Sequence, residues 1–501
     1  MNSVKYVVNI IKNSWEKQPF FVIMGCAIAF RALAVFFARG YGMHDDHFCV
    51  IETAQGWLNG SRDWFLAGHP IRSLVYPGLH YLLFGALERI HVFDPQIKMV
   101  IVRFFHAAYS LITVYFGYKT ALCITDKKTA NIIGLLLAIF WIFPFMAVRN
   151  LIEFVCIPPM IVGMYLIYKN NKINRGSIFL SGICFGLAFT LRFQTLSMAV
   201  ALGVVLLIKK EWKPVLFYSC GFLFSSFLVQ GLSDWIGYGR PFMSFMGYLL
   251  YNSENAYAYT TGPWYQYIGL LIGAFIPPLS LFLLFGFVRT WRKSAYIFWP
   301  TVAFLILHSI FPNKQERFIL PVIPFVLMLS VAGWQEFVLQ SDFWRNRSRL
   351  TKGLWAWFWV FNMVLLCVCS ITYSKKARVE TLSYLRHKAD LHGIIIESRD
   401  DAPPMAPLFY LGKNVPVFYA QPSKTAERLK REIDSCAASP NYVVFLDGKN
   451  IDTRIKKMAG VCAALAFERK IAPSFIDWLL YVMNPKHNVN QTSFIFKCSR
   501  Q

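Results

Sequence analysis

The chain has 501 residues, of which 56% are apolar and only 16% are charged. This composition excludes an ordinary soluble enzyme and indicates a polytopic membrane protein. Lysine and arginine exceed aspartate and glutamate by 51 − 27 = 24, but no basic segment accompanies a recognisable nucleic-acid-binding module. Basic loops that face the cytoplasm and anionic lipid headgroups explain the excess, so we expect no nucleic-acid partner.

Apolar runs of about 20 residues, the length that crosses a bilayer, recur along the chain. They lie at 19–39, 98–122, 129–148, 152–168, 176–192, 195–209, 213–233, 265–289, 295–312, 318–338 and 353–373. This pattern predicts a polytopic α-helical membrane protein with about eleven transmembrane helices, several of them short or broken. The turns between alternate runs are basic, which places the N-terminus in the cytoplasm. Loop 40–97, loop 234–264 and the tail after 373 then face outward.

Two regions outside these runs also show regular patterns. In the first outer loop, 46–58 and 75–90 have apolar residues at helical spacing, which predicts helices lying in the membrane interface. In the tail, short apolar runs at 393–396 and 442–446 flank a helical segment, 425–437. Strand, helix and strand indicate a small α/β domain. We therefore predict a transmembrane catalytic domain over 1–373 and an extracytoplasmic α/β domain over 374–501.

The eleven cysteines are scattered and lack the spacing of metal ligands or of a disulfide framework. Cys436, Cys462 and Cys498 share the polar tail and could pair there. The sequence does not say which two would pair.

An acid pair, Asp45 and Asp46, follows the first apolar run at the membrane surface. A carboxylate near a bilayer is costly unless it is solvated, paired or used in function. Adjacent carboxylates raise each other's pKa, which suits one of them to act as a base. Capping of the following helix is the structural alternative. We assign the pair to catalysis, with Asp45 as the general base that takes a proton from an attacking hydroxyl.

His44 and His47 flank the acid pair and are candidate substrate-binding residues. An isolated His-x-x-His with no third ligand is a weak zinc signal. A histidine with two aspartates could hold a divalent cation. We favour a reaction without metal or other cofactor.

If the attacked group is a phosphate ester, the reaction also needs positive groups that hold the departing phosphate. Arg72, Lys314 and Arg317 lie in outward loops, and an arginine fork suits a phosphate well. Arg149 and Arg192 close two other outer turns. For any single one of these residues the alternative is a side chain that reaches up to the lipid headgroups. We take Arg72, Lys314 and Arg317 as the donor phosphate-binding residues.

Several short motifs occur in the order found in one known family. They are the acid pair, Arg72-Ser73 with Tyr76-Pro77, Tyr251-Asn252, Pro263-Trp264 with Tyr267, and Lys314–Phe318 followed by Pro321. Together they resemble the GT-C mannosyltransferases that elongate dolichol-linked oligosaccharides and GPI anchors (glycosyltransferase family 22), over about residues 40–325. The chain departs from the family's His-Lys-Glu-x-Arg-Phe motif, because Asn313 replaces the histidine and Gln315 the first glutamate.

The resemblance implies a GT-C fold and an inverting transfer from a polyprenyl-phosphate sugar, typically dolichyl-phosphate mannose. The acceptor would be a glycolipid or lipid-linked glycan on the periplasmic or lumenal face. The departures in the last motif favour a bacterial inner membrane, with the ER membrane as the alternative. The substrate-binding residues carried over with the motifs are Tyr76, Tyr251, Asn252, Trp264, Tyr267 and Glu316.

Two other classes of protein remain as alternatives. A transporter or flippase of lipid-linked sugars should show two related halves with helices broken at matching positions, and the sequence has no such symmetry. A membrane scaffold without enzymatic activity would have no use for the outward acid pair and arginines. The transferase is therefore the preferred interpretation.

Overall fold

The computed structural model describes residues 13–61, 70–170, 173–400, 405–436, 438–485 and 488–499. The chain divides into two compact units. Unit 1 comprises Met1–Val35, Ser61–Leu79 and Arg103–Ser370, and unit 2 comprises Phe36–Gly60, His80–Val102 and Ile371–Gln501. The segment with the acid pair thus belongs with the tail, whereas its hydropathy had grouped it with the transmembrane helices.

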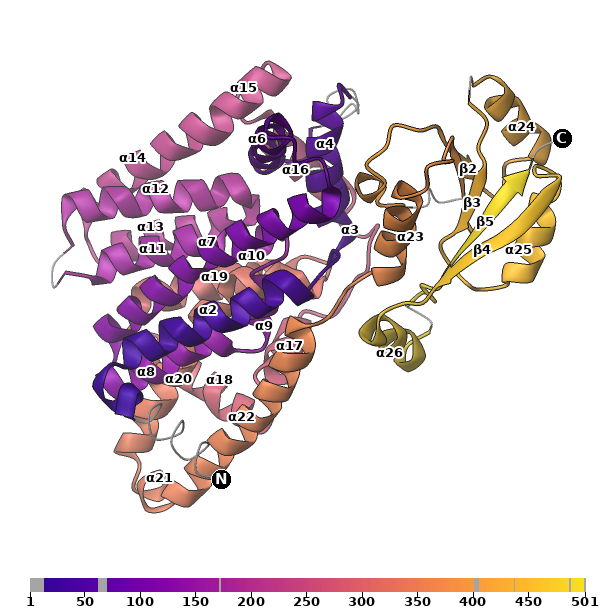
Figure 1. The fold of residues 1–501 in the computed structure, drawn as a ribbon. Coiled ribbons are helices and arrows are strands. Elements are labelled where there is room, and N and C mark those ends of the chain that lie inside the picture. The colour runs from indigo at the N-terminus through magenta and orange to yellow at the C-terminus, as the bar shows by residue number, and fades with distance from the viewer. Residues whose placement is uncertain are drawn as a thin grey trace. The chain divides into compact units, whose positions relative to one another are not determined.

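Unit 1 is built from helices (Figure 1). Its helices, some of which continue into unit 2, are α2 (Pro19–Phe37), α7 (Pro95–Ile124), α8 (Lys127–Ile139), α9 (Ile142–Met146), α10 (Ile152–Val155), α11 (Ile157–Tyr168), α12 (Arg175–Leu191), α13 (Leu196–Ile208), α14 (Trp212–Ser226), α15 (Leu232–Tyr238), α16 (Met243–Glu254), α17 (Gln266–Ala274), α18 (Leu279–Arg289), α19 (Ala295–Ile310), α20 (Ile323–Gln340), α21 (Asp342–Asn346) and α22 (Ser348–Ser370). Every predicted apolar run coincides with one or more of these helices, which confirms the helical class.

Helix length limits the number of membrane spans. Among the described residues, five helices are long and apolar enough to cross a bilayer, and the bent pair α17–α18, with 117° between its parts, would make a sixth. These five are Pro19–Phe37, Pro95–Ile124, Trp212–Tyr238, Glu316–Gln340 and Ser348–Ser370. The other apolar helices are shorter, because the chain breaks within or beside them. Eleven spans therefore stays a prediction.

One such break, between α8 and α9, shows how an interrupted helix is tolerated in an apolar interior. Asn362 of α22 is fully buried, and its amide nitrogen donates to the Ile139 carbonyl at 2.9 Å. Its side-chain oxygen accepts the Trp141 backbone N–H, also at 2.9 Å. A single amide thus satisfies both backbone groups that the break exposes, as a membrane interior requires.

Unit 2 contains a five-stranded sheet with the order β2-β1-β3-β5-β4. Its strands are β1 (Ile394–Glu397), β2 (Val417–Ala420), β3 (Tyr442–Phe445), β4 (Ala464–Ile471) and β5 (Ser493–Ser499). The first three are parallel, and β5 pairs antiparallel with both β3 and β4. The predicted strands at 393–396 and 442–446 are confirmed as β1 and β3, and β4 was missed because most of its side chains are exposed.

Helices α24 (Ala426–Asp434) and α25 (Ile451–Met458) bury Leu429, Ile433 and Met458 in the apolar core of this sheet. The predicted helix at 425–437 is therefore confirmed. Thr425 begins it as an N-cap, since its hydroxyl accepts the Arg428 backbone N–H at 3.3 Å. The remaining helices of the tail are α23 (Lys376–Arg386) and α26 (Phe475–Met483).

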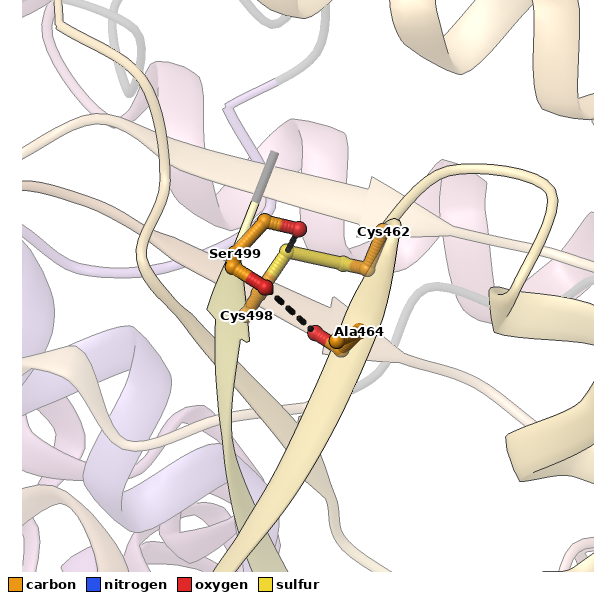
Figure 2. The surroundings of a disulfide bond; sticks show 4 residues. All are labelled: Cys462, Ala464, Cys498 and Ser499. Carbon is orange, nitrogen blue, oxygen red and sulfur yellow. Dashed lines mark hydrogen bonds between the residues drawn. A yellow bond between two sulfur atoms is a disulfide. The ribbon is translucent and has the colours of Figure 1, made fainter. Parts of the chain in front are cut away.

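A disulfide joins Cys462, just before β4, to Cys498 near the end of β5 (Figure 2). The two Cα atoms are 5.6 Å apart, within the ordinary range for a disulfide. Cys436, the third cysteine of the tail, is exposed and not part of it. The pairing that the sequence left open is therefore Cys462 with Cys498.

We expect Cys498→Ser to destabilise the tail by about 4 kcal/mol, because the bond closes a loop of 36 residues and limits the unfolded chain. Chemical unfolding of the purified full-length protein measures this loss. Cys436→Ser is the matched control and should leave the unfolding midpoint unchanged. Equal midpoints for the two variants would contradict a stabilising disulfide.

Candidate functional site

The acid pair lies on a short helical segment of unit 2. Helix α3 (His44–Asp46) runs into a π-helical turn, η1 (His47–Glu52), and then into α4 (Thr53–Leu58), so the helix predicted over 46–58 is present. Asp45 is half-buried and Asp46 is only 5% exposed. In this described segment neither carboxylate caps a helix: Met43 is the N-cap of α3, and Asp46 makes no side-chain cap bond to η1. A π-helical turn is frequent at functional sites.

His47 has a supporting role. It is 1% exposed, and its ring lies stacked between those of Tyr41 and Tyr410, with centroids at 4.7 and 5.4 Å. Its Nε2 is 3.2 Å from a carboxylate oxygen of Glu52, and that same oxygen accepts the Phe409 backbone N–H at 2.8 Å. His47 is thus enclosed and anchors the acid-pair segment to the tail, and its role in substrate binding stays a prediction.

His44 has a different environment. Its ring stacks on Phe48 at 5.9 Å, and its Nδ1 is buried without a hydrogen-bond partner among the described residues. Burial lowers the pKa of His44 to about 4, and the nearby charges of Arg378 and Lys375 act in the same direction. The ring is therefore neutral at physiological pH and can still form hydrogen bonds.

The second interfacial helix predicted in the first outer loop, 75–90, is α6 (Val75–Arg89). Leu79 and Leu82 are 54% and 66% exposed, while Phe84 and Leu87 of the same helix are buried. An apolar face left open beside a packed one is what a helix lying in the membrane interface requires.

In unit 1, three buried charges converge. Glu153 at the start of α10 places Oε1 2.5 Å from Nη1 of Arg192 and 3.6 Å from Nε of Arg317. The three residues are 2%, 3% and 8% exposed. Arg192 ends α12, and Arg317 lies in the short helix η4 (Glu316–Val322). Sequence reasoning had passed over Glu153, although an acidic residue between apolar runs at an outer turn is itself a functional signal.

This charge cluster keeps unused donor capacity. Two guanidinium groups approach the Glu153 carboxylate, and Nε of Arg317 also donates to the Gln315 side-chain oxygen at 2.8 Å. Nε and Nη2 of Arg192 are buried and have no hydrogen-bond partner within the described ranges. The charges of Arg192 and Arg72 both act on the phenol of Tyr248, so Arg72 lies near the same cluster. A buried site with excess guanidinium donors is suited to an anion.

Lys314 is engaged elsewhere. Its ammonium donates to the carbonyl oxygens of His308 and Ser309, both at 2.7 Å, and to that of Phe311. An ammonium has three donors, and all three are used at the C-terminal end of α19. Lys314 therefore caps a helix, and its assignment to the donor phosphate stays a prediction.

The other residues carried over from the motifs divide between buried and exposed positions. Tyr267 is 1% exposed, with its hydroxyl donating to the Gln315 carbonyl at 3.3 Å, so it packs in the core, and its role in substrate binding stays a prediction. Tyr76 is also buried, with its hydroxyl 3.0 Å from Nε2 of His106. Trp264 is 66% exposed, and Glu316 is exposed as well.

Tyr251 and Asn252 lie on α16 (Met243–Glu254). The Tyr251 hydroxyl contacts that of Tyr259, and the Asn252 amide donates to the Tyr248 carbonyl at 2.8 Å. Asn252 therefore supports the helix that carries Tyr248 beside the arginine cluster. Their roles in substrate binding stay predictions.

Among the described residues, no group of three or more His, Cys, Asp or Glu side chains could hold a metal ion. A reaction without a metal stays a prediction.

Comparisons with known proteins identify the family. The model of the Alg9-like mannosyltransferase family matches residues 22–392. GPI mannosyltransferase 3 of Saccharomyces cerevisiae is 23% identical over 183 residues, which is 34% of this chain and 29% of the yeast protein. This chain therefore matches less than a third of that relative's length.

Two solved structures have a similar fold. ArnT from Cupriavidus metallidurans bound to undecaprenyl phosphate superposes with a TM-score of 0.61 at 12% identity, over 96% of this chain and 99% of that one. The oligosaccharyltransferase AglB of Archaeoglobus fulgidus, in complex with an inhibitory peptide and a dolichol-phosphate, gives 0.50 at 12% identity, over 86% and 70%. These similarities show the GT-C fold. The chain therefore belongs to the Alg9-like mannosyltransferase family of membrane glycosyltransferases.

Proposed function

We propose that this protein moves a sugar, with mannose as the favoured one, from a polyprenyl-phosphate donor to a glycolipid or lipid-linked glycan acceptor. The observation that carries this proposal is the family match over 22–392, which encloses both the acid pair and the arginine cluster. Both relatives of known structure were solved with related ligands, undecaprenyl phosphate in one and a dolichol-phosphate in the other. The transporter alternative receives no comparable support.

Asp45 is the proposed general base. It takes the proton from the acceptor hydroxyl as that oxygen attacks the anomeric carbon, while the bond from this carbon to the phosphate oxygen breaks. A single displacement from the opposite face inverts the anomeric configuration. Asp46, more buried than Asp45, is a second carboxylate whose charge favours protonation of its neighbour during the reaction.

The leaving polyprenyl phosphate gains a negative charge in this step, so the site must supply positive charge. The cluster of Arg192, Arg317 and Glu153 offers it. Nε and Nη2 of Arg192 are buried without a hydrogen-bond partner among the described residues, and the oxygens of a donor phosphate would accept from them. We therefore place the phosphate-binding role on Arg192 and Arg317, with Arg72 near the same cluster, and we remove Lys314 from it.

The reaction face is the non-cytosolic one. Disulfides persist in oxidising compartments, and the Cys462–Cys498 bond of the tail therefore supports the orientation inferred from the basic turns. The periplasm and the ER lumen both satisfy this condition. The departures at Asn313 and Gln315 favour the bacterial inner membrane.

Replacing the proposed base tests the mechanism. Asp45→Asn keeps the size of the side chain but cannot accept the proton, so we expect transfer to fall by about 100-fold or more. The assay uses purified protein in nanodiscs, polyprenyl-phosphate mannose and candidate glycolipids, with thermal unfolding as the check on folding. Asp342→Asn, at a residue whose side chain is 80% exposed on α21, is the matched control. Wild-type turnover by Asp45→Asn would reject the assignment.

A second experiment separates the two cation assignments. Arg192→Lys keeps one charge but loses the fork geometry, and we expect its kcat/KM for the donor to fall by about 100-fold with the acceptor KM unchanged. Lys314→Gln should lower the unfolding temperature and leave the donor kcat/KM within about threefold, because it removes only a helix cap.

The double variant Glu153→Gln/Arg192→Gln controls for stability, since it removes one charge of each sign and avoids a lone buried carboxylate. We expect it to fold and still to use the donor poorly. If this variant and Arg192→Lys both use the donor normally while Lys314→Gln does not, the phosphate site proposed here is wrong.

A further inference from the structure

A cleft opens at the carboxyl ends of the parallel strands in unit 2. The sheet order places β2 on one side of β1 and β3 on the other, so the chain leaves β1 and β3 in opposite directions. In open parallel sheets the crevice at such a point is the usual ligand site. Ser398, Arg399 and Asp400 follow β1, Leu446 and Asp447 follow β3, and all of them line the cleft.

The acid-pair segment reaches this cleft. His44, the residue directly before Asp45, lines it together with Arg378 of α23. Both residues retain hydrogen-bonding capacity: His44 Nδ1 and Arg378 Nε are buried and have no hydrogen-bond partner among the described residues. The cleft thus combines the edge of the sheet with the segment that carries the proposed base.

The size of the cleft restricts its ligand. Its volume is about 170 Å³, below the roughly 300–1,000 Å³ of pockets that enclose drug-sized ligands. A single sugar ring fits this description, whereas a nucleotide or a polyprenyl chain does not.

The charges of the cleft are nearly balanced and held in place. Arg454 forms a bidentate ion pair with Glu397 and donates to the Asp447 carbonyl at 2.7 Å. Arg399 donates to the Asp447 carboxylate at 3.1 Å and also pairs with Asp400. Arg378 takes part in none of these ion pairs. Its Nη1 donates to the Met405 carbonyl at 2.9 Å.

This mixture of groups offers a polyphosphate little. The turn after β1, Glu397-Ser398-Arg399-Asp400, lacks the glycines that let backbone N–H groups cradle a phosphate, and the three guanidinium groups of the cleft are offset by three carboxylates, so it carries no net positive charge to attract one. The carboxylates of the cleft can accept hydrogen bonds and its guanidinium groups can donate them. Adjacent hydroxyls of a sugar need both kinds of partner. A site built to hydrogen-bond hydroxyls also rejects ligands that lack them.

We propose that this cleft binds one uncharged sugar unit of the acceptor glycan, next to the unit that receives the transferred sugar. This inference rests on the proposed function and extends it to the choice of acceptor. The family match ends at residue 392, before β1, so most of the residues of the cleft lie outside the part of the chain that the family shares.

The first test is binding by the full-length protein in nanodiscs, with an α-linked mannobiose as the probe in saturation-transfer NMR. We expect a mannobiose signal that inorganic phosphate does not displace. Arg378→Gln and Arg399→Gln should each reduce it about tenfold, which corresponds to the loss of one charge-assisted hydrogen bond. Arg428→Gln, at a side chain 70% exposed on α24, is the matched control and should keep the signal.

Kinetics give the second test. Arg378→Gln and Arg399→Gln should raise the KM for the acceptor about tenfold, with kcat within about twofold and the donor KM unchanged. A merely structural role would lower kcat and the donor kcat/KM together. The double variant Arg399→Gln/Asp447→Asn removes the pair, leaves only the more exposed Asp400 carboxylate without its cation, and should show the same increase in acceptor KM.

The outcomes distinguish this inference from the function on which it rests. Normal transfer by the wild type with no effect of the cleft variants on acceptor KM overturns the cleft assignment alone, as does displacement of mannobiose by phosphate. If the wild type transfers no sugar but binds mannobiose in a manner that Arg378→Gln abolishes, the proposed function is overturned and the sugar cleft stands.

Discussion

The carboxylate of Glu153, buried between Arg192 and Arg317, is the interaction on which the helical unit's chemistry depends. Polar groups taken out of water must be paired or hydrogen-bonded, and here Nε and Nη2 of Arg192 have no hydrogen-bond partner among the described residues. The same rule acts on backbone groups elsewhere in the unit: Asn362 hydrogen-bonds to both sides of a broken helix, and Lys314 donates to carbonyl oxygens at the end of another. Where compensation is complete, a buried polar residue is structural. Where it is incomplete, as at Arg192, the residue is available for a ligand.

The sequence predicts those features that depend on neighbouring residues. The length of the apolar runs predicted the helices, and two short apolar runs predicted β1 and β3, because both patterns are local. Local sequence patterns could not show which basic residues are suited to bind the phosphate. In the sequence, Lys314 and Arg317 are equally plausible phosphate-binding residues. Only the structure distinguishes them, because the ammonium of Lys314 donates to carbonyl oxygens at the end of α19. Glu153 was missed for the same reason, since its partners lie far from it in the chain.

The acid-pair segment shows a second limit of local patterns. Hydropathy groups residues by their distance from apolar runs, so it placed the whole first outer loop with the membrane helices. The contacts that hold this segment are with the tail instead: Glu52 accepts the Phe409 N–H, and Gly40 forms a bridge with Ser374. Gly40 has a positive φ and leaves no room for a Cβ beside the Ser374 carbonyl, so only glycine suits this contact. The geometry of Asp45 and Asp46 is therefore set by residues more than 300 positions later.

The division of the chain then has a chemical meaning. The helical unit holds the buried arginines suited to the lipid phosphate, and the other unit holds both the acid pair and the cleft at the edge of the sheet. The phosphate of the proposed donor can be held by buried positive charge alone. Acceptor glycans differ in the positions of their hydroxyls, so their recognition needs a more specific site. His44 links the cleft to the acid pair, because it lines the cleft and directly precedes Asp45. In the proposed reaction, a sugar unit bound in the cleft would contact the short helix that carries Asp45, so recognition of the acceptor and activation of its hydroxyl would share one support.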